Sequence, residues 1–361
     1  MRFEDIPKVR LYNQHITKPC FREAREVVKW LGAVQAQDYL GSLWAIGLRL
    51  RGSTESMIEK AIENREIVRS WPMRGTLHLV TAEDLRWMLK FLAPRVIQRS
   101  TGLYRQAGLD SKVFAKSRKL VSIALKGESQ LTRNEIYAVL QRARISTSEQ
   151  RGLHILGYLA QTGLICFGPR KGKQQTFVLV DEWLPLSKIP AKEEALATFA
   201  LTYFQSHGPA TIHDFSWWSG LTIIEARKAL QSIESKLVQE FVDGKTHYML
   251  PAKQPQKKSG QAFLLPSYDE YFVAYKDRSA ALDPKLANNI KQLGNGIFTS
   301  PIVINGLMAG YWKRRLVKDT IMVETNIFSS MNKSAIDSIE TAARRYGKFL
   351  KMPVAVSGKY V

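Results

Sequence analysis

The stretch Leu131-Thr132-Arg133-Asn134-Glu135 opens the clearest structural pattern in this sequence of 361 residues. Thr132, followed three residues later by Glu135, forms a capping box, an arrangement that starts helices. Apolar residues at helical spacing predict a short helix after it and a second helix over about 149–162. Two β-rich runs, 164–167 and 176–180, then predict a hairpin. The order helix, helix, hairpin is typical of a winged helix-turn-helix, whose second helix enters the major groove of DNA.

The same order of elements recurs in the next segment of the chain. A helix is predicted over Ala195–Ser206, and a short helix begins near Thr211. Thr222 with Glu225 forms a further capping box, which predicts another helix. A hairpin follows across the turn Asp243-Gly244-Lys245. This segment therefore predicts another winged helix.

The first third of the chain repeats the theme less regularly. Helical patterns over 22–34, 39–50 and 55–63 precede two β-rich runs that are joined at Arg74-Gly75. A longer helix is predicted over about 82–101. We expect this part of the chain to form the first of three related units.

After Leu250 the composition changes. Residues 251–260 are rich in Lys, Gln and Pro and are typical of a linker. Short β-rich runs follow, among them Glu270–Tyr275, and one helix is predicted over Lys333–Leu350. Asn305-Gly306 between two such runs is a strong hairpin signal.

The whole pattern predicts an α+β fold: three tandem winged helix-turn-helix units followed by a C-terminal β-barrel-like domain. The large aromatic residues Trp71, Trp217, Trp218 and Trp312 are expected in the core. The expected domain boundaries are 1–110, 111–188, 189–252 and 253–361.

Composition points to a polyanionic partner. The chain has 53 Lys and Arg against 32 Asp and Glu, a formal charge of +21, and such an excess is most simply explained by nucleic acid. Cys20 and Cys166 alone cannot form a disulfide framework or a four-cysteine zinc site, and no HExxH spacing occurs. No apolar run approaches a membrane span. We expect a cytoplasmic protein, associated with the nucleoid through DNA, without a metal or cofactor.

Basic residues cluster on or beside the predicted hairpins. Alone, each cluster is as well explained by a solvated charged face, but several together favour contacts to phosphates. The predicted DNA-binding residues are Arg69, Arg74, His78, Arg170, Lys171, Lys173, Lys276, Arg278, Lys313 and Arg314.

Two glutamines one residue apart, Gln35-Ala36-Gln37, follow an apolar segment. Their structural explanations are hydrogen bonding at a helix end or simple exposure. An amide is not a general base near neutral pH, but its donor and acceptor groups can orient a water molecule. That chemistry suits a substrate whose leaving group already departs well. The neighbouring carboxylate of Asp38 is a candidate contributor.

Six short motifs, taken in order, resemble the AlkZ-like family of bacterial DNA glycosylases over nearly the whole chain. They are Leu31-Gly32-Ala33-Val34-Gln35-Ala36-Gln37, Trp71-Pro72-Met73-Arg74-Gly75-Thr76-Leu77-His78, His207-Gly208-Pro209-Ala210-Thr211, Trp217-Trp218-Ser219-Gly220-Leu221, Leu264-Leu265-Pro266-Ser267-Tyr268-Asp269-Glu270 and Gly310-Tyr311-Trp312-Lys313-Arg314.

The resemblance implies three winged-helix units around a positively charged DNA cleft and a C-terminal β-barrel. The family's functional motif is Gln-apolar-Gln, or Gln-apolar-Asp in a second branch; here it falls on Gln35 and Gln37. Members excise alkylated purines, and some unhook interstrand crosslinks. A β-hairpin enters the DNA, for which Arg69–Val80 and Phe167–Phe177 are the candidates.

The resemblance therefore implies a monofunctional DNA glycosylase that acts as a monomer on duplex DNA, without a metal. The main alternative is a non-enzymatic winged-helix DNA-binding protein or transcriptional regulator. Such a regulator usually dimerises on a palindromic site, whereas three units in one chain suit a monomer. A nuclease is the weaker alternative, because the sequence has no cluster of metal ligands.

Overall fold

The computed structural model describes residues 1–251, 260–283, 285 and 299–359. In these residues the fold is mixed α+β, and the chain divides into two compact units. Unit 1 combines Met1–Ile58 with Leu196–Val361, and unit 2 is Glu59–Ala195. The expected first segment, 1–110, is thus divided between the two units.

Unit 2 contains the predicted hairpin at Arg74-Gly75. Strand β2 (Ile67–Met73) pairs antiparallel with β3 (Thr76–Thr81). Arg74 and Gly75 both have positive φ, 58° and 80°, as a type I′ turn requires. Helix α4 (Glu55–Glu63) precedes the hairpin and α5 (Ala82–Arg99) follows it, which confirms the predicted order.

The capping box that opens the sequence pattern forms as predicted. Thr132 Oγ1 accepts a hydrogen bond from the Glu135 N–H at 3.3 Å, and the Thr132 N–H donates to Glu135 Oε2 at 2.7 Å. The elements around it are α6 (Thr101–Gln106), α7 (Ser111–Leu125), β4 (Leu131–Thr132), α8 (Arg133–Arg142), α9 (Arg151–Gln161), β5 (Ile165–Phe167), β6 (Thr176–Leu179) and α10 (Val180–Trp183). Strand β6 lies between β4 and β5, and apolar side chains of the helices and strands share one buried cluster.

Unit 1 begins with a short helical segment and three helices; the second helix precedes the glutamine motif and the third follows it. These elements are η1 (Phe3–Asp5), α1 (Ile6–Asn13), α2 (Ala24–Leu31), β1 (Val34–Gln35) and α3 (Tyr39–Gly47). The predicted helices over 22–34 and 39–50 are confirmed, with shorter bounds.

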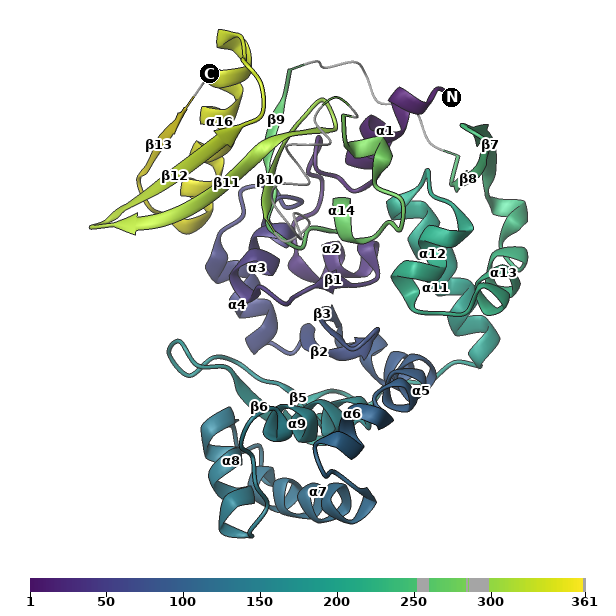
Figure 1. The fold of residues 1–361 in the computed structure, drawn as a ribbon, viewed down its shortest axis with the longest axis vertical. Coiled ribbons are helices and arrows are strands. Elements are labelled where there is room, and N and C mark those ends of the chain that lie inside the picture. Colours follow the sequence, from purple (N-terminus) through teal and green to yellow (C-terminus); the bar gives the residue numbers. More distant parts are fainter. Residues whose placement is uncertain (252–259, 284, 286–298, 360–361) are drawn as a thin grey trace. The chain divides into compact units, whose positions relative to one another are not determined.

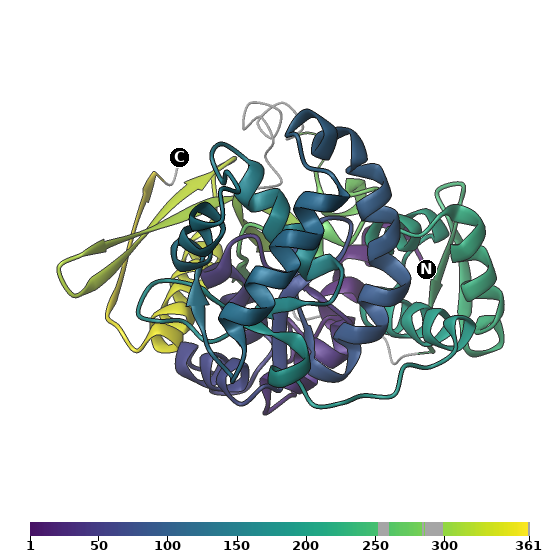
Figure 2. The ribbon, with the colours of Figure 1, turned by 90° about the horizontal axis from the view of Figure 1, so that it is seen from below.

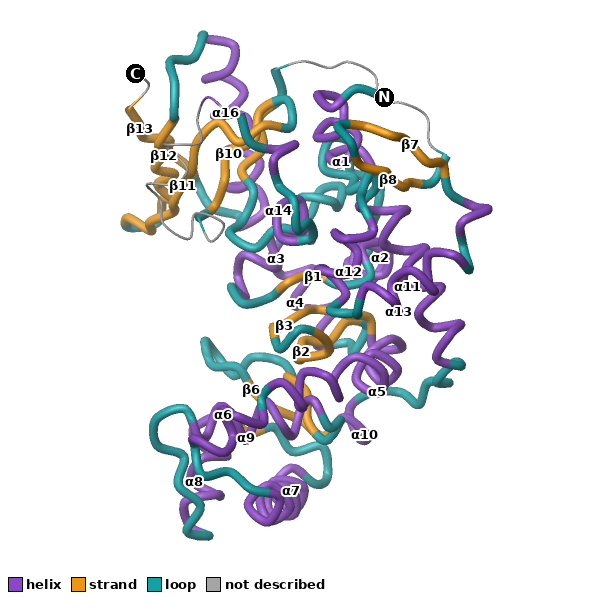
Figure 3. Tube along the Cα trace, turned by 45° about the vertical axis from the view of Figure 1, so that its right-hand side comes forward, coloured by secondary structure: helices purple, strands orange, loops and turns teal. Residues whose placement is uncertain are grey.

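The second repeat of helices and a hairpin also forms, and its hairpin is visible at the edge of Figure 3 as two orange strands. Its elements are α11 (Lys192–His207), α12 (Ile212–Ser219), α13 (Ile223–Gln231), η2 (Glu234–Lys236), β7 (Val238–Val242) and β8 (Lys245–Met249). Thr211 with Asp214 and Thr222 with Glu225 both form capping boxes. The turn of the hairpin falls at Asp243-Gly244, as predicted.

The C-terminal part of unit 1 is a curled five-stranded sheet in the order β13-β12-β11-β10-β9. Its elements are β9 (Ala262–Leu264), α14 (Glu270–Val273), η3 (Ser279–Ala281), β10 (Ser300–Ile304), β11 (Leu307–Val317), β12 (Thr320–Ile327), α16 (Lys333–Leu350) and β13 (Val354–Lys359). Within this sheet β12 and β13 pair in parallel, and the other neighbouring strands pair antiparallel. Figure 2 shows β11 and β12 extending as a long hairpin to one side. The sheet is a half-barrel, which agrees in part with the expected barrel.

Two expectations about unit 1 are wrong. A strand was expected over Glu270–Tyr275, but helix α14 begins at Glu270. Asp269 caps this helix by accepting a hydrogen bond from the Tyr271 N–H at 2.9 Å. Trp217 was expected in the core but is 46% exposed, whereas Trp71, Trp218 and Trp312 are buried. Most of the predicted linker, 252–259, lies outside the described residues. No helix among the described residues is long and apolar enough to span a membrane.

Candidate active site

The glutamine motif lies where α2 ends and the chain turns into β1. Gly32 makes this turn with a φ of 78°, in a region of conformational space that favours glycine. Gln35 is buried, with 7% of its surface exposed, whereas Gln37 is exposed. The structure therefore places one amide inside the protein and the other at the surface.

The turn before the motif packs tightly against α11 and α12. A Cβ atom at Gly32 would lie 3.2 Å from both Trp218 Cη2 and Thr202 Cγ2. Such distances are shorter than ordinary van der Waals contacts, so no side chain fits there without displacing a neighbour. The approach to Gln35 is thus fixed by close packing as well as by the turn.

A buried carboxylate holds the backbone of the motif. Glu270 at the start of α14 is 0% exposed. Its Oε1 accepts from the Gln35 N–H at 2.8 Å, and its Oε2 accepts from Trp218 Nε1–H at 2.9 Å. Glu270 thereby links β1 to α12 through α14, and Figure 1 shows α14 close to β1.

His207 faces the same carboxylate. Ser206 Oγ donates to the Thr202 carbonyl, so it accepts from His207 Nδ1–H, which is 2.8 Å away. Among the described residues Nε2 has no hydrogen-bond partner, and it lies 3.7 Å from Glu270 Oε2. Burial lowers the pKa of His207, and the negative charge of Glu270 opposes this shift.

The segment that carries Glu270 is itself firmly held. Asp269 accepts two hydrogen bonds of 2.9 Å from Arg49, and both side chains are 0% exposed. Arg49 also donates to both oxygens of Gln14, the carbonyl at 3.0 Å and Oε1 at 2.8 Å. The indole N–H of Trp44 donates to the Leu264 carbonyl at 2.7 Å. These bonds make the segment a rigid support.

Asp38 lies between the motif and α3. Its side chain folds over Gly41 in the first turn of α3. Burial raises the pKa of Tyr268, and the charge of Asp38 adds to the effect. Burial also raises the pKa of Tyr346, whose hydroxyl accepts a hydrogen bond from Arg314.

The hairpin β2–β3 contains three predicted DNA-binding residues. Arg69 is buried; it lies over the Phe167 ring and donates to Gln175 Oε1 at 3.3 Å. His78 Nδ1 is 2.9 Å from the Thr76 carbonyl and must carry the proton, so Nε2 accepts from Arg74 at 3.1 Å. Burial lowers the pKa of His78 well below its usual range, and Arg74 lowers it further.

The connection between β5 and β6 carries the next basic cluster and projects as a narrow loop in Figure 1. Lys171 and Lys173 are exposed. Arg170 is half-buried and pairs with Glu59 at 2.6 Å. Two of the three predicted cations thus lie at the tip of a hairpin and in contact with solvent.

The predicted basic residues of unit 1 differ in exposure. Lys276, Lys313 and Arg314 are exposed. Arg278 is half-buried and donates from Nε to the Phe272 carbonyl at 2.8 Å. Burial lowers the pKa of Arg278.

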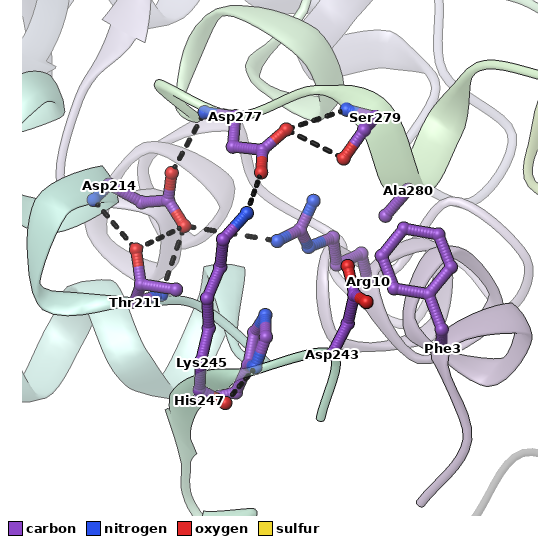
Figure 4. A pocket seen from close by; sticks show the side chains of 10 residues that line it. All are labelled: Phe3, Arg10, Thr211, Asp214, Asp243, Lys245, His247, Asp277, Ser279 and Ala280. Carbon is purple, nitrogen blue, oxygen red and sulfur yellow. Dashed lines mark hydrogen bonds and ion pairs between the residues drawn. The ribbon is translucent and has the colours of Figure 1, made fainter. Parts of the chain in front are cut away.

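A small pocket elsewhere in unit 1 is lined by charged side chains (Figure 4). Lys245 pairs with Asp277 at 2.6 Å, and Arg10 lies 4.0 Å from Asp214. Each cation therefore faces a carboxylate, so the pocket offers little net charge to a ligand. The ion pair between Lys245 and Asp277 is better explained as a link between β8 and the segment after α14.

Within the described ranges, no group of three or more His, Cys, Asp or Glu side chains is placed to hold a metal ion. Sequence patterns placed Trp218 in the core and indicated no function for Glu270 or His207, although all three lie in the motifs that carry the family resemblance. Glu270 bonds to Gln35 and Trp218 and lies 3.7 Å from His207, and so brings together parts of the chain far apart in sequence.

Comparisons with known proteins agree on one family. The family model "DNA glycosylase AlkZ-like" matches residues 28–349. An interstrand DNA cross-link repair glycosylase from Streptomyces sahachiroi is 25% identical over 324 residues, covering 84% of this chain and 85% of that protein. The structure of the Streptomyces sahachiroi DNA glycosylase AlkZ matches with a TM-score of 0.79 at 22% identity, over 99% of this chain and 100% of the other, which shows a common fold. The chain therefore belongs to the AlkZ-like family of DNA glycosylases.

Proposed function

We propose that this protein hydrolyses the N-glycosidic bond of N7-alkylated purines in duplex DNA, with a water positioned by Gln35 and Gln37. The observation that carries the proposal is the motif itself, held by Glu270 and exposed at Gln37, in a chain of this family.

The chemistry required is modest. Alkylation at N7 makes the purine cationic, so its glycosidic bond breaks without a strong general acid. The enzyme must then hold a water in line with the breaking bond and stabilise the developing charge. The amide of Gln37 has a donor and an acceptor for such a water, while Gln35 supports it from the buried side.

No lysine lies in the motif to form a Schiff base with the sugar. We therefore propose a monofunctional enzyme that leaves an abasic site. Asp38 is retained as a contributor to the charge around the water, because it lies next to Gln37 and is exposed.

We propose that three winged-helix units and the exposed cations bind the duplex through its phosphates. The formal charge of +21 and the exposed Lys171, Lys173 and Lys313 support this binding mode. The hairpins β2–β3 and β5–β6 remain the two candidates to enter the DNA. We also propose that crosslinked purines are substrates, because the Streptomyces sahachiroi relative is named for crosslink repair.

The test is incubation of the pure protein with duplexes that carry one N7-methylguanine, one bulkier N7 adduct or one N7 crosslink, scored for abasic sites. Abasic sites at the damaged position, and none in undamaged DNA, are expected. Binding without abasic sites on every substrate would refute the proposal and favour a non-enzymatic DNA-binding protein.

A further inference from the structure

We propose that Glu270 is a positioning residue: its buried carboxylate fixes the backbone of Gln35 and thereby the placement of both glutamine amides. The inference rests on the proposed function, because it assigns a cause to the geometry of that site. Glu270 itself is 0% exposed, so it acts through Gln35 and not on the substrate.

The burial of this carboxylate calls for an explanation. An ionised carboxylate is costly to bury unless charged partners or several hydrogen bonds compensate. The adjacent Asp269 has such a partner in Arg49, at 2.9 Å. Glu270 instead accepts from two uncharged donors, the Gln35 N–H and the Trp218 indole. Each of its two oxygens thus accepts from a donor on a different element, an arrangement that a glutamine, with a single acceptor oxygen, cannot reproduce.

The hydrogen bond from the Gln35 N–H to Glu270 lies at the first residue of the glutamine motif. A bond to a charged acceptor is stronger than one between neutral groups, and this one holds the amide of Gln35, the first residue of the motif. Gln37 follows two residues later along the same backbone. A displacement of the backbone at Gln35 is therefore passed to Gln37.

The other side of the carboxylate is fixed as well. Trp218 lies in α12 with 0% exposure and also limits the space beside Gly32. Asp269 caps α14 and is locked to Arg49. The motif is thus held between two rigid elements of unit 1, as a catalytic group needs if its geometry is to survive DNA binding.

The test measures single-turnover cleavage of an N7-methylguanine duplex and DNA affinity for Glu270→Gln and Trp218→Phe. In Glu270→Gln the amide oxygen can still accept from Gln35, but its NH₂ then meets the Trp218 N–H. We expect the rate to fall about 10–100-fold with DNA affinity unchanged, because a misplacement of about 1 Å costs up to about 100-fold. Trp218→Phe removes the second donor and part of the ring but leaves the bond between Gln35 and Glu270, so its rate should fall less.

Two variants are matched controls. Asp214→Asn alters another buried carboxylate of unit 1, which accepts from the Thr211 N–H at 2.9 Å. Trp30→Phe removes an indole N–H that donates to the Asn13 carbonyl at 2.8 Å. Both should retain the wild-type rate after correction for any loss of folded protein, measured by thermal unfolding.

A readout without catalysis is amide hydrogen exchange over residues 33–37. Glu270→Gln should exchange faster there and not in α16, whereas unchanged exchange would overturn the inference. A wild-type cleavage rate in Glu270→Gln together with an inactive Gln35→Ala would also overturn it, while leaving the proposed function intact. An inactive wild-type enzyme, or wild-type rates in both glutamine variants, would refute the proposed function itself.

Discussion

Replacement of Gly32 by alanine tests whether the turn before the motif sets the geometry of the site. Gly32 has a φ of 78° and a ψ of −37°, and a non-glycine residue held in such a region costs about 1–3 kcal/mol. The new Cβ would also press on Trp218 and Thr202 at 3.2 Å, and overpacking costs about 1–3 kcal/mol. The combined loss is therefore about 2–6 kcal/mol.

Gly52→Ala is the matched control. Gly52 also has a positive φ, 58°, but a Cβ there would have nothing within 4 Å. The Gly52→Ala substitution should lower the free energy of unfolding by about 1–2 kcal/mol through backbone strain. It should have no effect on the cleavage rate. At about 2–4 °C per kcal/mol, Gly52→Ala should lower the Tm by about 2–8 °C.

The two variants are compared in two assays. Circular dichroism monitors thermal unfolding, and single-turnover cleavage is measured at a temperature where both variants are folded. Gly32→Ala should unfold at a lower temperature than Gly52→Ala and cleave more slowly as folded protein. Equal stability and equal rates in the two variants would refute the argument that close packing at Gly32 positions the motif.

Three further changes have distinct signatures. Arg74→Ala should weaken DNA binding and reduce the slope of log K against log salt by about 1; an unchanged slope would place Arg74 outside the interface. His78 stays neutral in the folded state, because burial lowers its pKa, while the unfolded chain takes up a proton below about pH 6.5. The contribution of His78 to stability should therefore be full above about pH 6.5 and be lost as the pH drops. The Tm of His78→Asn should fall less steeply with decreasing pH than the Tm of the wild type. An equal fall of Tm in the two proteins would contradict the role of His78. Asp269→Ala leaves Arg49 buried without its carboxylate, so chemical denaturation should show a loss of about 3–5 kcal/mol; a loss below about 1 kcal/mol would show that the pair is not a structural anchor.

Local signals allowed much of the fold to be predicted. The capping boxes at Thr132 and Thr222 depend on a spacing of three residues, and both form. The turns at Arg74-Gly75 and Asp243-Gly244 depend on the conformational freedom of adjacent residues, and both occur. These features are readable because each is decided within a few residues of sequence.

Features that depend on distant parts of the chain were missed. The aromatic and β-branched residues after Asp269 favour a strand, but the Asp269 cap and burial on all sides produce α14. Arg69 and His78 are polar residues of a predicted hairpin and were expected to contact DNA, yet both are buried. The bond between Gln35 and Glu270 joins residues 235 positions apart, and no local pattern encodes such a pair.

The central claim is that two amides position a water at a bond already weakened by alkylation. Its most direct test is the single-turnover rate of base release from N7-methylguanine duplex for the wild type, Gln35→Ala and Gln37→Ala, with DNA affinity measured alongside. Loss of a positioned polar group of this kind costs about 100–1,000-fold, so both variants should bind DNA like the wild type and release the base that much more slowly. Wild-type rates in both variants would contradict the account.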